Sequence, residues 1–216
     1  MDESDWPRGS AGPASRRQTY LAVAGYGVAL FGVFSAGSAF ELTVTKGVCW
    51  VYLMSYFIAF VVVLAVRRVG RFGTGIAVFL PYAIPGFFIE YYMEYVLSPS
   101  LIAPWATAVW AGNGLVAGLV ADLSQRWLPK SLGDARRAIV CGVATVTTYW
   151  ALTLLTLAFL YVNPTPGIAH FLNGIAFTLP WLVVSGAFGG YTAYTLSRTR
   201  AARPGTVAPV TTASRP

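Results

Sequence analysis

The stretch GVCWVYLMSYFIAFVVVLAV, residues 47–66, contains no charged side chain and is followed directly by the basic pair Arg67 and Arg68. A helix needs about 20 mostly apolar residues to cross roughly 30 Å of hydrocarbon. Lysine and arginine concentrate where a spanning helix leaves the membrane on the cytoplasmic side. The stretch therefore predicts a transmembrane helix whose C-terminal end is cytoplasmic.

The rest of the chain has the same apolar character. Only 11% of its 216 residues are charged and its mean hydropathy is +0.61, whereas about 25% of the residues in a soluble domain are charged. We predict an all-α integral membrane protein, multi-pass in the cell membrane, in which six transmembrane helices form a compact bundle. The predicted spans are residues 19–40, 47–66, 75–96, 105–123, 138–162 and 171–196.

The basic residues lie in short clusters between the apolar runs, and fourteen of the fifteen fall on one predicted face of the membrane. Because this bias marks the cytoplasmic side, both termini are predicted to be cytoplasmic. The net charge of +7 thus indicates membrane orientation, and no nucleic-acid partner is expected. Residues 1–18 and 197–216, rich in Pro, Ala, Ser and Thr, are predicted to be disordered tails.

Two further expectations follow from this orientation. Cys49 and Cys141 would lie on opposite sides of the membrane, so no disulfide is expected between them. Asp122, at the cytoplasmic end of the fourth span, is expected to pair with a basic residue there.

The third span ends in a cluster of acidic and aromatic residues, Glu90, Tyr91, Glu94 and Tyr95. The two glutamates are four residues apart and therefore share one face of a helix. Carboxylates beside aromatic faces form a favourable site for an organic cation, and Trp50 is placed near the same boundary. The alternative is that both glutamates reach interfacial water and the aromatic residues form only a membrane-interface belt.

Two more polar residues are candidates for the same site. Asn113 lies mid-span and needs a hydrogen-bond partner, which could be another helix or a ligand, and His170 lies at the outer end of the sixth span. No His, Cys or carboxylate cluster has the spacing of a metal site, and no phosphate loop or nucleophile motif is present. We therefore predict no catalytic residue, no metal and no cofactor.

Small residues recur at the four-residue spacing that lets two helices approach closely. We interpret this spacing as helix packing inside one bundle, with an interface to another chain as the alternative. The pairs are Gly25 and Ala29, Gly32 and Ala36, Gly114 and Gly118, and Gly186 and Gly190.

The short-looped, six-helix pattern and the segments AGNGLVAGLVADL (111–123) and SGAFGGYTAY (185–194) resemble the substrate-binding S components of energy-coupling-factor vitamin importers. The resemblance covers about 180 residues. It implies a substrate pocket that opens outward, and a first helix that docks on a partner subunit through small residues. The nearest equivalents of that docking pattern here are Gly25-xxx-Ala29 and Gly32-xxx-Ala36.

We therefore expect a membrane transport subunit that binds a small cationic or aromatic solute in an outward-facing pocket. Glu90 and Glu94 would supply charge, with Tyr91, Tyr95 and Trp50 stacking on the solute. Because no nucleotide-binding motif is present, other membrane subunits and an ATPase module are expected partners, together with the lipid bilayer. The alternatives are an accessory subunit of a larger membrane complex, and an intramembrane enzyme that uses the two glutamates as acid and base.

Overall fold

The computed structural model describes residues 16–40, 50–92, 104–160 and 166–201. These residues form six α-helices and one short 3-10 helix, and they include no strand, which confirms the prediction of an all-α protein. The helices are α1 (Arg16–Phe40), α2 (Trp50–Val69), α3 (Thr74–Tyr92), α4 (Pro104–Trp127), η4 (Lys130–Leu132), α5 (Asp134–Leu160) and α6 (Pro166–Ala201).

Two helices extend into the segments predicted to be disordered tails. α1 begins at Arg16 and α6 ends at Ala201, so the last residues of one predicted tail and the first of the other are helical. The predicted bounds followed apolar composition, whereas the helix continues through polar residues. In α6, Ser197 donates a hydrogen bond to the Tyr194 carbonyl and Arg198 donates one to the Tyr194 hydroxyl.

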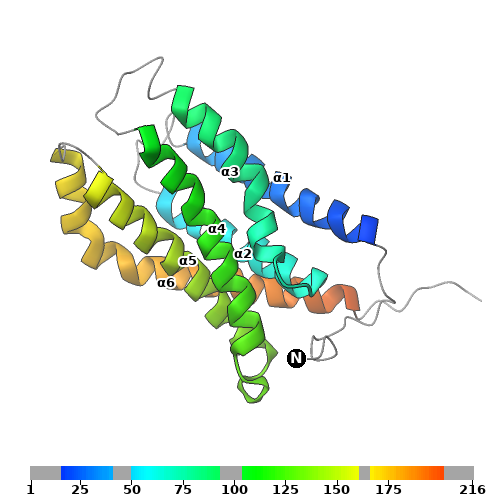
Figure 1. Ribbon diagram of the computed structural model, residues 1–216. Coiled ribbons are helices and arrows are strands. Elements are labelled where there is room, and N and C mark those ends of the chain that lie inside the picture. The colour runs from blue at the N-terminus through cyan, green and yellow to red at the C-terminus, as the bar shows by residue number, and fades with distance from the viewer. Residues whose placement is uncertain (1–15, 41–49, 93–103, 161–165, 202–216) are drawn as a thin grey trace, which may run out of the picture.

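Helix α2 lies at the centre of the arrangement and contacts each of the other five α-helices. Its side chains are apolar around the whole circumference, as in a helix that is buried on all sides, and the consecutive residues 61–66 are all buried. Figure 1 shows α3 beside α4 and α5 beside α6, and α1 packs on α2 and α3.

Glycines bring α3 and α4 into backbone contact. A Cβ built on Gly75 would collide with the carbonyl of Gly118, and a Cβ on Gly118 would collide with that of Gly75. The atoms that each Cβ would meet belong to the backbone and cannot move aside. Neither Gly75 nor Gly118 can therefore be replaced by a larger residue without separating the two helices. The predicted role of Gly114 and Gly118 in packing inside the bundle is confirmed, since Gly114 lies against the ring of Phe79.

The contact between α5 and α6 is built in the same way. Gly142 of α5 faces the backbone of Gly186 and Gly190 of α6, and Gly190 in turn faces Ala138. The predicted packing role of Gly186 and Gly190 is therefore confirmed as well.

In α1 the predicted small residues are not the ones that pack. Gly25 and Gly32 are exposed, and a Cβ on either would meet no atom within 4 Å among the described residues. Gly27 makes the close contact instead: a Cβ there would lie 2.5 Å from Cγ of Pro81 in α3. The expectation that Gly25 and Gly32 pack inside the bundle is wrong, because spacing alone does not fix which face of a helix meets its neighbour.

The outside of the bundle is strongly apolar. Within the described residues, two helical stretches, Arg17–Ala36 and Asp134–Thr156, are long and apolar enough to cross a membrane. Large apolar side chains are also exposed on other helices, among them Leu80, Ile84, Phe88, Val116, Trp181, Val184 and Phe188. A water-soluble monomer rarely exposes so much apolar surface.

Candidate functional site

The residues predicted to bind a solute belong to one end of the bundle. Glu90 and Tyr91 lie in the last turn of α3, Trp50 is the first residue of α2, and His170 is near the start of α6. Their side chains lie outside the part of the chain that the structure describes, and Glu94 and Tyr95 lie outside the described residues altogether. Their predicted role in binding stays a prediction.

Asn113 lies inside the bundle, with 5% of its surface exposed. Its side-chain Nδ2 donates a hydrogen bond of 3.1 Å to Oγ1 of Thr156, which joins α4 to α5. The Thr156 hydroxyl in turn donates to the carbonyl of Leu152, 2.7 Å away. The sequence left two hydrogen-bond partners open for Asn113, another helix or a ligand. In the structure the partner is Thr156 of another helix, α5.

Aromatic rings from three helices meet near the centre of the bundle. The ring centroids of Phe34 in α1 and Tyr82 in α3 are 4.1 Å apart, and Tyr149 in α5 lies 6.3 Å from both Phe34 and Phe79. We call Phe34, Phe79, Tyr82 and Tyr149 the aromatic cluster. Separations of this size are those at which aromatic pairs attract one another.

A second buried polar contact adjoins the aromatic cluster. Trp150 packs edge-on against Tyr149, with 5.5 Å between the ring centroids. Its indole Nε1 donates a 2.8 Å hydrogen bond to Oγ of Ser55, a fully buried residue of α2. Rings together with a few hydrogen-bonding groups are the usual composition of small-molecule sites.

Charged side chains lie inside the end of the bundle where α2 ends and α3 and α5 begin, opposite the end that holds Glu90 and Trp50. Asp122 of α4 is fully buried, and its carboxylate accepts hydrogen bonds of 3.1 Å from the backbone N–H groups of Gly73 and Gly75. These amides open α3, and the carboxylate therefore caps that helix from a neighbouring one and complements the positive end of its dipole. Among the described contacts Asp122 has no basic partner, so the expected ion pair is wrong: backbone N–H groups supply the compensation.

The turn before α3 makes this capping possible. Gly70 and Gly73 have positive φ angles of 64° and 88°, a conformation that costs little only for glycine. They reverse the chain within a few residues after α2 and present the first amides of α3 to Asp122.

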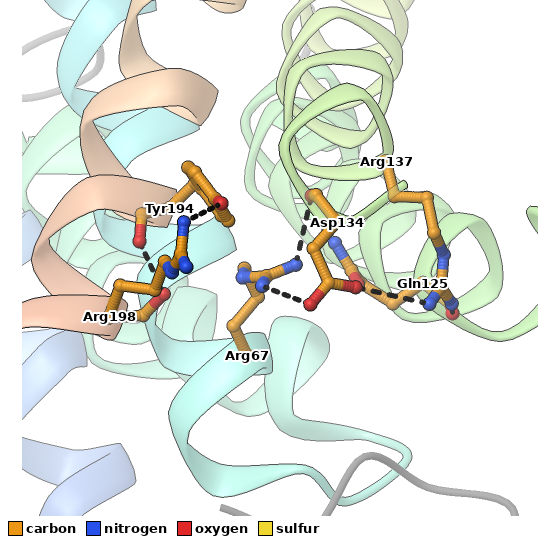
Figure 2. Close-up of polar contacts among 7 residues, drawn as sticks. Arg67, Gln125, Asp134, Arg137, Tyr194 and Arg198 are labelled. Atoms are coloured by element: carbon orange, nitrogen blue, oxygen red, sulfur yellow. Dashed lines mark hydrogen bonds and ion pairs between the residues drawn. The ribbon is translucent and has the colours of Figure 1, made fainter. Parts of the chain in front are cut away.

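At the start of α5, Arg67 and Arg137 lie close to Asp134, and Arg198 of α6 lies beside Tyr194 on the other side of Arg67 (Figure 2). We call Arg67, Arg137 and Arg198, together with Gln125, Asp134 and Tyr194, the arginine cluster. Arg67 of α2 lies 3.9 Å from the Asp134 carboxylate and donates a 3.4 Å hydrogen bond to the Asp134 carbonyl. Arg137 lies 3.9 Å from the same carboxylate and donates to the carbonyl of Gln125 in α4.

The ring of Tyr194 in α6 lies between two of these cations. The guanidinium carbons of Arg67 and Arg198 are 5.5 Å and 5.8 Å from the ring centroid, within the range of cation–π attraction. Figure 2 shows Arg67 between Tyr194 on one side and Asp134 on the other. Arg67 directly follows the predicted second span, and burial lowers the pKa of its guanidinium while Asp134 opposes that shift.

Sequence reasoning missed the arginine cluster because it counted these residues only as markers of orientation. One signal was available: Asp134 is the single acidic residue in the otherwise basic segment 126–137. No group of three or more His, Cys, Asp or Glu side chains that could hold a metal occurs within the described residues.

Comparisons with protein-family models, with curated proteins and with solved structures find no match to this chain. The resemblance to vitamin-importer S components stays a prediction.

Proposed function

We propose that all six helices cross the cell membrane and that both termini are cytoplasmic. Two observations support this: apolar side chains cover the outside of the bundle, and basic residues gather where α2 ends and α5 begins. With this orientation, the start of α2, the end of α3 and the start of α6 would lie at the opposite, outward end. The basic residues in the described helices and turns at the cytoplasmic end include Arg67, Arg68, Arg71, Arg126, Lys130, Arg136, Arg137 and Arg198.

We propose further that the protein is a membrane transport subunit that binds a small cationic or aromatic solute from the outward end. The aromatic cluster is the observation that carries this proposal, together with the adjoining Ser55–Trp150 hydrogen bond and the Asn113–Thr156 hydrogen bond inside the same bundle. Within an apolar bundle, these are the groups able to stack on a ring or cation and to exchange hydrogen bonds with it.

Glu90 lies further along α3 than the aromatic cluster. Tyr82 of the aromatic cluster precedes Glu90 by eight residues in α3, which is roughly 12 Å along a helix axis. A solute entering from the outward end would meet the carboxylate of Glu90 first and the aromatic rings afterwards. Charge would attract a cation and the rings would hold its apolar part.

The test is purification of the tagged protein in mild detergent, followed by native mass spectrometry. We expect a small molecule that co-purifies with the wild type and is lost in Glu90→Gln. Glu41→Gln is the matched control, because Glu41 lies between the first and second predicted spans and therefore on the same predicted face as Glu90, and the variant removes the same charge. A well-folded Glu90→Gln protein that retains the molecule would remove Glu90 from the site, and an empty wild type would contradict solute binding.

A second candidate is an accessory subunit of a larger membrane complex. The exposed face of α1 favours it, since Gly25, Ala29, Gly32 and Ala36 line one side of the helix and are all exposed, and a Cβ on either glycine would meet no described atom within 4 Å. Small residues of this kind let helices of different chains approach closely in lipid. On this account the chain would be isolated in a stoichiometric assembly and would carry no solute, an outcome that the same native mass spectrum distinguishes.

A further inference from the structure

The arginine cluster contains three buried hydrogen-bond donors without an acceptor in the described structure. They are Nε of Arg67, Nε of Arg137 and Nε2 of Gln125, the last of which lies beside the thiol of Cys141, a weak acceptor that makes no regular hydrogen bond with it. Buried polar atoms in folded proteins nearly always have a partner, so a group of three in one place calls for an acceptor that the chain does not provide.

The cluster also carries more positive than negative charge. The side chains of Arg67 and Arg137 are only 14% and 8% exposed, and both lie against the one carboxylate of Asp134. At 3.9 Å the two ion pairs are longer than charge-assisted hydrogen bonds, which are about 2.7–2.9 Å long. The guanidinium groups of Arg67 and Arg137 thus share the carboxylate of Asp134, and neither forms a close ion pair with it.

Asp134 differs from its partners in exposure. Its side chain is 63% exposed, so the carboxylate can turn into water at little cost while the two arginines stay in place. It also stands at the first residue of α5, where the positive end of the helix dipole favours an anion. Asp134 therefore occupies the position that a more strongly binding anion would take.

We propose that the arginine cluster is a binding site for a negatively charged phosphate group, with the Asp134 carboxylate as the group it displaces. A phosphate has enough oxygen atoms to accept hydrogen bonds from both guanidiniums and from the Gln125 amide. It also neutralises the second arginine, which a bound water molecule cannot do. Planar guanidiniums are the side chains best suited to phosphate recognition.

The source of the phosphate follows from the proposed orientation. At the cytoplasmic end of the spans the cluster would face the headgroups of anionic lipids, and basic sites between helices at this level bind such headgroups. A free phosphate in solution has the same chemistry and is the other source. Only this choice of source depends on the proposed function, whereas the phosphate site itself does not.

Purified full-length protein in mild detergent can be titrated with phosphatidylglycerol and with phosphatidylcholine of the same acyl chains, with bound lipid counted by native mass spectrometry. We expect phosphatidylglycerol to bind at least about tenfold more tightly than the zwitterionic lipid. Arg137→Gln should weaken that binding by about tenfold, the size of one lost charge-assisted contact. Arg136→Gln is the matched control, because Arg136 is exposed and removal of its charge should change binding by less than about twofold.

Asp134→Asn provides a test that does not depend on the folding of an arginine variant, because the side chain it alters is mostly exposed. Removal of the competing carboxylate should strengthen phosphatidylglycerol binding about threefold. Competition by inorganic phosphate at constant ionic strength would identify free phosphate as a ligand of the site, and its absence would identify the lipid headgroup. Equal binding of both lipids, unchanged in Asp134→Asn, together with no effect of inorganic phosphate, would overturn the proposal. None of these readouts requires a bound solute.

Discussion

In α4, Gly114 and Gly118 lie against the ring of Phe79 and the backbone of Gly75, whereas in α1 the exposed Gly25 and Gly32 meet no described atom within 4 Å of a Cβ. The two helices carry small residues at the same four-residue spacing. The difference shows that this spacing makes a helix face able to pack closely but does not specify its partner. For α4 the partner is α3 of the same chain, and for α1 we infer that it is another membrane subunit.

The largest expected effect comes from filling the α3–α4 crossing. Gly118→Ala places a methyl group against the backbone of Gly75 and Ile76, which cannot move aside as a side chain can. We expect the free energy of unfolding to fall by about 1–3 kcal/mol, as for other overpacked contacts. Gly25→Ala, with open space around it, is the matched control and should leave the stability unchanged or slightly higher. Thermal unfolding in detergent, monitored by circular dichroism, measures the stability of both variants. An equal loss of stability in Gly118→Ala and Gly25→Ala would contradict the difference drawn between α4 and α1.

The two aspartates at the end of the bundle that holds the arginine cluster provide a second comparison of a buried and an exposed group. Asp122→Ala leaves the N–H groups of Gly73 and Gly75 without their acceptor, which should cost about 1–3 kcal/mol. Asp134→Ala removes only two long ion pairs of an exposed carboxylate and should cost about 0–1 kcal/mol. The midpoint of denaturant-induced unfolding measures the loss of stability in each variant. A larger loss of stability in Asp134→Ala than in Asp122→Ala would show that Asp122 does not cap α3.

A smaller effect on stability is expected at the contact between α4 and α5. Asn113→Leu removes the hydrogen bond to Thr156, whose hydroxyl keeps its bond to the Leu152 carbonyl. Hydrogen bonds between membrane helices contribute about 0.6 kcal/mol on average, so the bundle should remain folded. If Asn113 also contacts the solute, the variant should lose the co-purifying molecule despite normal stability. Retention of the molecule would restrict Asn113 to helix packing.

The sequence was sufficient to predict the helices but not their contacts. Apolar runs gave six helices close to their observed positions, because helix formation and apolar composition are both local properties. The capping of α3 by Asp122 was missed, since the expected partner was a cation and the actual partners are backbone amides brought close by the turn at Gly70 and Gly73. The arginine cluster was missed for a related reason: its members come from four helices, α2, α4, α5 and α6, that only the fold brings together.

The exposed face of α1 gives the most direct test of the claim that this chain works with a partner subunit. Wild type and Gly25→Leu, each tagged and extracted in mild detergent from the native membrane, can be compared by native mass spectrometry. We predict that the wild type is found with a second membrane protein at fixed stoichiometry, and that Gly25→Leu is found alone, with the thermal stability of the isolated chain. A wild type that occurs only as a single chain, or a variant that keeps its partner, would contradict the account.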